Sequence, residues 1–331
     1  MHDGALRVRK SFKGDQSTGP WGATTLRREI RYMEALDGQV AEYFPKLLAA
    51  WATPGQLGYE MSYVEGALDA GSLARSGAMT QVEADAFQER LAEVVFGVLH
   101  RPVEPQDSLA EHLRTVINDV LERLGARDDF KALIDAPTVL LNGRDVRGPR
   151  AAFRWLVERH DATETLDRPP CVRLHGDLFL ENILLPRGAG RPTEFILIDP
   201  VSVAGIMQGH PLFDLVKYES YATGELPAMR SEKVEIDGFD SDTRGRYVYR
   251  VCRDDPAIRP FRQIDWHRRF RAAYVLKYGR IDWVAYRLLE AYFALVMAVC
   301  TKGVQRQARL CKGTWALNAA MSDWAAEDKA D

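Results

Sequence analysis

The sequence predicts an α+β protein of two lobes, a small β-rich N-terminal lobe at residues 1–66 and a large, mainly helical lobe at residues 67–331. The first 66 residues read as short extended segments around one helix, with breaks at glycine and proline. From Ala67 onward, apolar residues recur every three to four positions, which is typical of amphipathic helices. One pair of apolar strands, near residues 171–199, interrupts these helices and carries polar residues at its ends.

The N-terminal lobe begins with an expected strand in GALRVRKSF, where side chains alternate in character and glycine bounds the segment. A helix is expected in TTLRREIRYMEALDG, because Leu26 and Ile30 have helical spacing and Gly38 follows as a stop. PKLLAAWAT and LGYEMSYVEG are separated by Pro54 and Gly55, an arrangement typical of a hairpin. The chain would leave this lobe through a linker near residues 59–66.

The second lobe opens with helices, expected in QVEADAFQERLAEVVFGVLH, LAEHLRTVINDVLERLG and GPRAAFRWLVERH, whose outer faces are charged. Two strands are expected in CVRLHGDLFLENILL and EFILIDPVSVAG, on either side of the glycine- and proline-rich turn PRGAGRPT. Residues 215–331 complete the lobe as a helical region.

The composition favours a soluble protein of a reducing compartment. Four cysteines are scattered without a CxxC pair, so neither a disulfide framework nor a cysteine metal site is expected. The start MHDGALRVRKSF lacks the apolar stretch of a secretory signal, and the run AYFALVMAVC is about half the length that a membrane span requires. We expect a cytoplasmic protein without membrane or nucleic-acid partners. The oligomeric state is left open.

Charge is distributed unevenly along the chain. The formal net charge is −3, yet residues 244–312 hold sixteen Lys/Arg and five Asp/Glu, a local balance of +11. The remainder therefore sums to −14. Such a basic region either forms a solvated surface or serves an anionic substrate or acidic partner. The acidic stretch EIDGFDSD is expected to be an exposed loop.

The two strands of the second lobe carry polar residues that a buried strand does not need. Asp177 and Asn182 stand five positions apart after the first strand, and Asp199 follows the apolar FILI of the second. Phosphoryl transfer requires a carboxylate to receive the proton of the acceptor hydroxyl, and oxygen ligands to hold magnesium against the nucleotide phosphates. These three side chains are of the right types for that chemistry.

HGDLFLENILL together with ILIDP resembles the signature of the aminoglycoside phosphotransferase and choline kinase-like families. The resemblance implies a protein-kinase-like fold, ATP as co-substrate, with GTP possible, and Mg²⁺ as cofactor. It implies a catalytic loop at 175–182, in which Asp177 is the catalytic base and Asn182 a catalytic residue and magnesium ligand. Asp199 becomes the main magnesium ligand and contacts the phosphates. His175 would be architectural.

Further segments fit the same resemblance. GHPLFDLVKYE is similar to a family segment whose aspartate, here Asp214, braces the catalytic loop, with His210 where the family usually has aspartate. In REIRYMEAL, Glu29 would be the helix glutamate that pairs with a strand cation near the phosphates. Lys10 is the preferred partner and Arg7 its rival, because alternation lets only one register face the nucleotide. The backbone of residues 61–63, from Met61 to Tyr63, would bind adenine.

One part of the family pattern is missing. The hairpin with the glycine-rich loop should precede the lysine strand, but only nine residues precede Lys10. The chain begins late, or it covers the phosphates differently, or it is a degenerate enzyme. The glycines of KGDQSTGPWG, Gly14, Gly19 and Gly22, are expected to form a flexible loop, with wrapping toward the phosphates as the alternative.

The sequence therefore predicts a small-molecule kinase that moves the γ-phosphate to a hydroxyl group. Aminoglycosides are polycations and need carboxylate-rich pockets, whereas residues 244–312 are basic. This favours a neutral or anionic acceptor, such as a sugar, a nucleoside or a natural-product intermediate. The alternatives are a nucleotide-binding scaffold without turnover and a protein kinase. Segments that shape the acceptor site are expected within residues 215–331.

Overall fold

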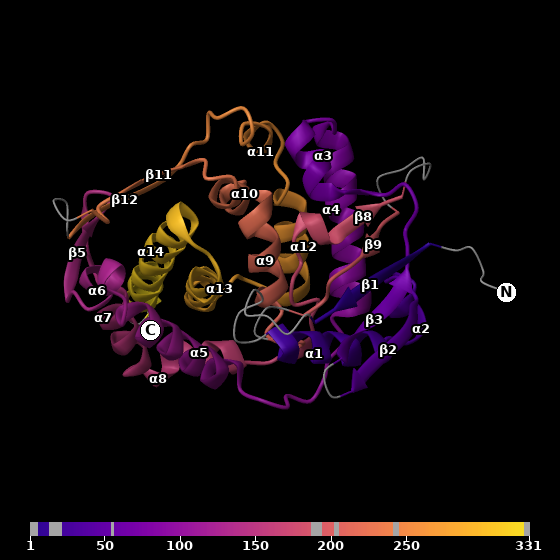
Figure 1. The fold of residues 1–331 in the computed structure, drawn as a ribbon, viewed down its shortest axis with the longest axis horizontal. Coiled ribbons are helices and arrows are strands. Elements are labelled where there is room, and N and C mark those ends of the chain that lie inside the picture. Colours follow the sequence, from indigo (N-terminus) through magenta and orange to yellow (C-terminus); the bar gives the residue numbers. More distant parts are fainter. Residues whose placement is uncertain are drawn as a thin grey trace. The chain divides into compact units, whose positions relative to one another are not determined.

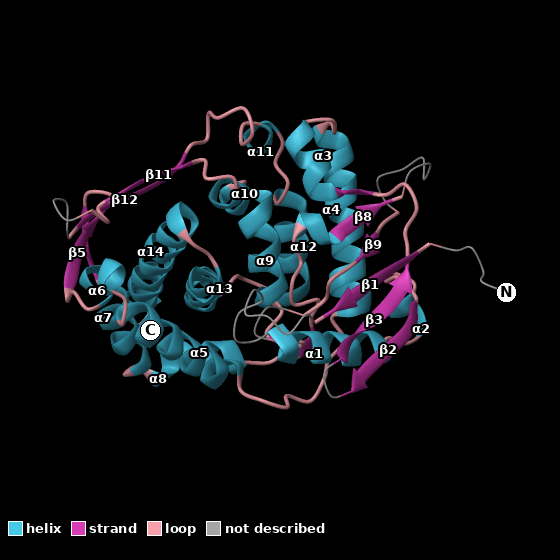
Figure 2. Ribbon diagram, viewed as in Figure 1, coloured by secondary structure: helices cyan, strands magenta, loops and turns pink. Residues whose placement is uncertain are grey.

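A computed structural model describes residues 6–12, 22–53, 56–186, 194–201, 205–240 and 245–327. Strands form a sheet near the N-terminus and helices dominate the rest, which confirms the predicted α+β class (Figures 1 and 2). Contacts divide the chain into two compact units. The first comprises residues 1–103, 172–223 and 260–279, and the second 104–171, 224–259 and 280–331. The expected boundary at residues 66/67 lies inside the first unit, so the division into lobes stays a prediction.

The N-terminal sheet has three antiparallel strands in the order β1-β3-β2, with β1 at Arg7–Ser11, β2 at Leu47–Thr53 and β3 at Gln56–Ser62. Helix α1 (Gly22–Glu34) packs Leu26 and Ile30 against Leu57 and Tyr59 of the central strand. Burial of these apolar side chains holds the helix on the sheet. A short helix α2 (Gly38–Ala41) follows, so Gly38 begins a helix instead of ending one.

Helix α4 (Gln81–Val94) begins at a capping box, in which Thr80 and Glu83 satisfy each other's backbone N–H groups. It continues as one π-helical turn, η2 (Val95–Leu99), where the His100 N–H reaches the Val95 carbonyl. The extra residue of a π-turn changes the direction in which the following side chain points. The other elements of the first unit are β4 Leu68–Asp69, α3 Ala70–Ser76, β7 Val172–Arg173, η4 Leu180–Asn182, β8 Ile183–Leu185, β9 Ile196–Leu197, β10 Gln208–Gly209, α9 Leu212–Ala222, α11 Pro260–Gln263 and α12 Arg268–Tyr278.

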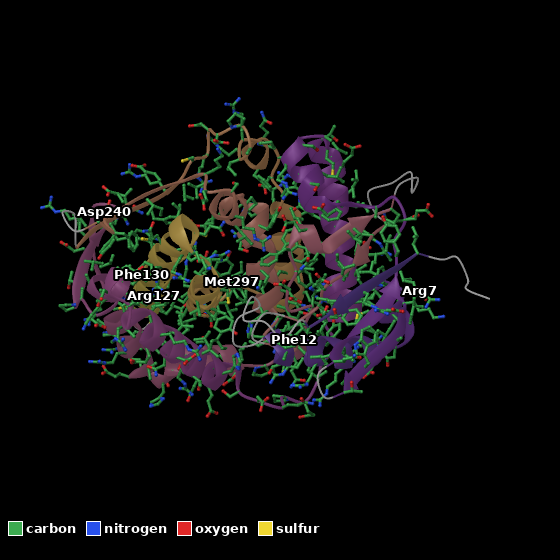
Figure 3. The ribbon with its side chains drawn as sticks, in the orientation of Figure 1. Arg7, Phe12, Arg127, Phe130, Asp240 and Met297 are labelled. Atoms are coloured by element: carbon green, nitrogen blue, oxygen red, sulfur yellow. The ribbon has the colours of Figure 1, made fainter. Side chains whose placement is uncertain are left out.

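The second unit combines helices with a four-stranded sheet in the order β11-β12-β5-β6, in which β12 and β5 are parallel. Helix α14 contacts this sheet along β12 and packs against α13. In Figure 3, Arg127 and Phe130 lie together at the start of α6, with the guanidinium 5.3 Å from the ring centre. The elements are α5 Leu109–Gly125, α6 Asp128–Ile134, β5 Thr138–Leu141, β6 Arg144–Arg147, α7 Pro149–Val157, α8 His160–Glu164, η3 Thr165–Asp167, α10 Glu225–Arg230, β11 Val234–Asp237, β12 Arg246–Val251, α13 Trp283–Cys300 and α14 Gly303–Glu327.

This second sheet corrects one expectation. The acidic stretch EIDGFDSD was expected to be an exposed loop, but Glu235 to Asp237 belong to strand β11. Glu235 lies opposite Arg250 of β12, and their side chains form an ion pair of 3.5 Å. Glu235 therefore faces a basic residue across the two strands, whereas Asp237 lies opposite Val248. Asp242 lies outside the described residues.

Helix α13 has the length and composition of a membrane span, the one such helix among the described residues. In the structure, 61% of it is buried against other parts of the protein. An apolar core helix passes the same test, so this feature is weak support for a membrane segment.

Candidate functional site

The loop that carries the HGD motif, residues 175–177, begins where β7 ends, and its first residues are fixed by one buried carboxylate. Asp214, in the first turn of α9, accepts hydrogen bonds from the N–H groups of His175 and Gly176, each 2.8 Å long. Gly176 has φ +82°, a conformation that glycine adopts without strain. The side chains of Asp214 and His175 are both fully buried. The expected role of Asp214 as a brace corresponds to these contacts.

A second histidine contributes to this brace. His100 is buried, and its Nε2 lies 3.0 Å from Asp214 Oδ2. The π-turn η2 delivers the imidazole to this position. Burial alone would raise the pKa of Asp214, but the hydrogen bonds from His100 and Gly176 and the charge of His175 hold that pKa below its usual value. The carboxylate therefore remains ionised inside the protein.

Asp177 lies in contact with two polar side chains. The Nδ2 of Asn182 donates to the Asp177 carbonyl at 2.8 Å and lies 3.3 Å from its Oδ2. The other oxygen, Oδ1, accepts a hydrogen bond of 2.8 Å from Lys217 Nζ. The Asp177 side chain keeps 22% of its surface exposed, so a small molecule can reach it.

Lys217 is a site residue that the sequence analysis missed. Its side chain is 4% exposed, and its Nζ lies 4.6 Å from the centre of the Phe179 ring in addition to the ion pair with Asp177. One signal could have found it. Lys217 stands three residues after Asp214 on the same helix, and this spacing places both on one face, toward the catalytic loop.

Asp199 is placed by the hairpin of β8 and β9, in which Ile183 pairs with Leu197. Beyond the last pair, the Ile198 N–H donates to the Asn182 carbonyl at 2.9 Å, so the residues at the two strand ends lie side by side. Asp199 itself has φ +51°, a left-handed conformation that few residues other than glycine adopt. Such outliers persist where the surrounding structure enforces them, and functional sites are frequent examples.

Lys10 connects the N-terminal sheet to this site. Its Nζ lies 2.8 Å from Glu29 Oε1 and 3.2 Å from Asp199 Oδ1. Tyr59 donates a hydrogen bond of 2.6 Å to the same oxygen of Glu29. Burial alone would lower the pKa of Lys10, but Glu29 and Asp199 raise it above its usual value, so the ammonium stays charged.

Arg7, the alternative to Lys10 as partner of Glu29, pairs with a different carboxylate. Arg7 lies 3.6 Å from Glu60 Oε2, and Arg9 bonds the other oxygen of Glu60, on the opposite face of the strand. Figure 3 shows Arg7 at the outer end of β1. Lys10, and not Arg7, therefore pairs with Glu29.

The predicted adenine-binding stretch is partly occupied by the protein's own contacts. Met61 lies in the central strand, paired with Val8 and Leu47, and its side chain is buried in the core beneath α1. The N–H groups of Ser62 and Tyr63 donate to chain carbonyls at 2.9 Å and 3.3 Å. Backbone contacts to adenine would therefore have to use carbonyl groups here or the residues that follow. Gly14 and Gly19 lie outside the described residues, and Gly22 begins α1.

The donor set fits magnesium in type. Asp199 supplies a carboxylate with 42% of its side chain exposed, and Asn182 uses its amide nitrogen toward Asp177, which leaves its amide oxygen available. Magnesium prefers such oxygen ligands and usually completes its shell with water and substrate phosphates. No cluster of three or more His, Cys, Asp or Glu that could hold a metal ion occurs among the described residues.

Comparisons with known proteins give little sequence support. No family model matches the chain, and no curated protein matches it. Among solved structures, the chain is similar to a crystal structure of an aminoglycoside-3'-phosphotransferase of type VIII, with 14% identity and a TM-score of 0.41. The alignment covers 84% of this chain and 81% of that one.

Proposed function

We propose that this protein transfers the γ-phosphate of a nucleoside triphosphate to a hydroxyl group of a small molecule, with ATP as the expected phosphate donor. One observation carries the proposal: Lys10 contacts both Glu29 and Asp199, so a buried helix glutamate, a strand lysine and a strand-end carboxylate converge. A charged lysine between two carboxylates, beside a loop aspartate and asparagine, is the set of parts that phosphoryl transfer uses.

Each residue has a distinct part in the proposed reaction. The acceptor oxygen bonds to the γ-phosphorus while the bond to the bridging oxygen of the nucleoside diphosphate breaks, and Asp177 takes the hydroxyl proton. Lys217 and Asn182 hold the carboxylate of Asp177 in place through the contacts of 2.8 Å and 3.3 Å. Lys10, positioned by Glu29, binds the phosphates. Asp199 and Asn182 would hold magnesium, which neutralises phosphate charge when it is bound.

The acceptor class follows from charge. Residues 244–312 remain basic by eleven charges, which favours a neutral or anionic acceptor over a polycation. A cytoplasmic location, without membrane or nucleic-acid partners, belongs to this proposal as its simplest setting.

Calorimetric titration with ATP, GTP and their non-hydrolysable analogues, with and without magnesium, tests the nucleotide site. We expect magnesium-dependent binding that Asp199→Ala weakens, because a metal ligand acts on binding as well as on turnover. Asp177→Asn should bind nucleotide normally and lose turnover by orders of magnitude. Asp37→Asn, an exposed carboxylate of the same unit, is the matched control. Absence of nucleotide binding would refute the proposal, and binding without turnover toward any hydroxyl acceptor would indicate a nucleotide-binding scaffold.

A further inference from the structure

The second unit contains a polar cavity of about 200 Å³ where α10, β12 and α14 contact one another. Glu225, in the first turn of α10, and Tyr249 of β12 line one part of it. Lys312 and Trp315 line another part and stand three residues apart on α14, which places them on one face of the helix. Arg253, two residues after the end of β12, completes the lining described here. Pockets for drug-sized ligands measure about 300–1,000 Å³, so this cavity suits a smaller molecule, of monosaccharide size.

Two charged side chains in the cavity keep unused hydrogen-bonding capacity. The Lys312 ammonium lies 2.9 Å from Glu225 Oε2 and 2.9 Å from Glu290 Oε1. An ammonium has three N–H donors, so one is left without a partner in the part of the chain that the structure describes. Glu225 Oε1 accepts a hydrogen bond of 2.7 Å from the Tyr249 hydroxyl, and each carboxylate oxygen can accept a second one. The side chains of Lys312 and Glu225 are 15% and 21% exposed, so a molecule in the cavity can reach both.

The charges that line the cavity do not cancel. Burial alone would lower the pKa of Lys312, but Glu225 and Glu290 raise it above its ordinary value, so the ammonium stays charged. The charge of Glu290 is matched in addition by Arg287, 2.6 Å away. Arg253 is exposed, and no described residue forms an ion pair or hydrogen bond with its guanidinium. Two cations, Lys312 and Arg253, therefore stand against the one carboxylate of Glu225, an excess of one positive charge.

These groups fit a ligand with one negative charge and several hydroxyl groups. The planar guanidinium of Arg253 can bind a carboxylate through two parallel N–H···O bonds. Glu225 can accept from a ligand hydroxyl but repels a second negative charge, so a doubly charged phosphate fits less well. Trp315 supplies apolar surface for the C–H groups of a ring. Arg144 lies 5.5 Å from the centre of the indole and helps to fix its orientation.

We propose that this cavity binds a small hydroxylated carboxylic acid, of the size of a sugar acid. Arg253 holds the carboxylate, while the spare donor of Lys312 and the spare acceptor of Glu225 hold hydroxyl groups. The site goes beyond the proposed phosphoryl transfer, because its residues all belong to the second unit and its occupancy can be measured without nucleotide.

The first experiment is calorimetric titration of the full chain with D-glucuronate at constant ionic strength, without nucleotide. Arg253→Met removes the exposed guanidinium from the cavity, and Arg250→Met is the matched control. Arg250 lies on β12 between Tyr249 and Val251, which both line the cavity, so alternation turns its side chain to the opposite face, where it pairs with Glu235. We expect at least tenfold weaker binding in Arg253→Met and wild-type affinity in Arg250→Met. Glucuronate held elsewhere persists in both variants, so only the Arg253-dependent part counts.

Further ligands and one further variant test the chemistry and the location. D-glucose lacks the carboxylate, acetate lacks the hydroxyl groups, and inorganic phosphate carries more charge, so each should bind at least tenfold more weakly than glucuronate. Bound glucuronate should change the tryptophan fluorescence of the wild type but not that of Trp315→Phe.

Three results would overturn the site: no binding of glucuronate, equal affinity in wild type and Arg253→Met, or a fluorescence change that persists in Trp315→Phe. Glucose, acetate or phosphate that binds as tightly as glucuronate in an Arg253-dependent way would overturn the assigned ligand class.

Discussion

Replacement of Asp214 by asparagine tests whether one buried carboxylate holds the loop of His175, Gly176 and Asp177. One oxygen accepts from the His175 N–H and contacts His100 Nε2 at 3.0 Å, and the other accepts from the Gly176 N–H. The amide keeps one acceptor oxygen, so at least one of the two backbone donors loses its partner. Hydrogen bonds to charged groups contribute about 1.5–3 kcal/mol each, and an unpaired buried donor costs about 1–3 kcal/mol. We expect Asp214→Asn to lower the free energy of unfolding by about 3–5 kcal/mol, as when a buried charge pair is broken.

Urea unfolding measures the total loss of unfolding free energy. Amide hydrogen exchange at His175 and Gly176 shows whether that loss arises at these two backbone contacts. Both amides should exchange faster in the variant, because their acceptor is weakened. Asp37→Asn removes an exposed carboxylate, 69% accessible and 3.3 Å from Arg101, and should leave unfolding and these two amides unchanged. An Asp214→Asn protein with wild-type stability and wild-type protection at both amides would refute the reasoning.

The lowered pKa of the Asp214 carboxylate predicts that the free energy of unfolding depends on pH. The pKa of Asp214 is lower in the folded protein than in the unfolded chain, so the carboxylate stabilises the fold fully above its unfolded pKa of about 3.9. That contribution is lost as the pH falls through the lower, folded pKa. The difference in unfolding free energy between wild type and Asp214→Asn should therefore be largest near neutral pH and shrink below about pH 4.

Three further predictions concern other contacts. Lys217→Met removes the cation 2.8 Å from Asp177 and should reduce turnover by about 10- to 150-fold, with nucleotide affinity nearly unchanged. This range follows from the loss of one hydrogen bond between charged groups, about 1.5–3 kcal/mol. Lys46→Met, at an exposed lysine, is the control, and equal kinetics of the two variants would contradict the role of Lys217. Lys312→Met removes the cation that Glu225 and Glu290 share, although Glu290 keeps Arg287, and should lower the free energy of unfolding by about 3–5 kcal/mol in chemical unfolding. Unchanged stability of this variant would contradict the role of Lys312. Gly148→Ala would bring its Cβ within 2.1 Å of the Ala136 carbonyl oxygen and should lower the free energy of unfolding by about 1–3 kcal/mol. Gly97→Ala, with open space around it, should not, and equal stability of the two variants would contradict the reasoning.

Local patterns in the sequence predicted the first unit well. The alternation around Lys10, the helical spacing of Leu26 and Ile30, and the break at Pro54 and Gly55 gave the three strands and the helix of the N-terminal sheet. These elements form between neighbours in sequence, so short-range patterns specify them. Asp177 and Asn182, singled out by their spacing, lie in contact, while their roles and that of Asp199 stay predictions.

Contacts between distant residues were harder to predict. His100 reaches Asp214 only because a π-turn adds one residue to α4, and periodicity does not reveal such a turn. In the sequence, Lys217 does not differ from other helical lysines, because its contact with Asp177 depends on how the helix packs against the loop. The sheet of the second unit pairs β12 with β5, more than a hundred residues earlier in the chain, and its strands are short. Their exposed acidic and basic residues were therefore mistaken for a loop.

The π-turn at η2 makes the length of the α4 segment a structural constraint. The His100 N–H bonds the Val95 carbonyl five residues back, where a regular α-helix bonds four residues back. Deleting Gly97 would turn this contact into an ordinary α-helical bond and leave His100 in place. Inserting one further residue after Gly97 would instead swing the side chains that follow around the axis by about 100°, the advance of one helical residue. The imidazole of His100 would then leave Asp214, although every residue of the loop that Asp214 holds would still be present in the sequence. A single-codon insertion far from that loop would thus release it, while substitutions at the exposed Gly97 would be tolerated.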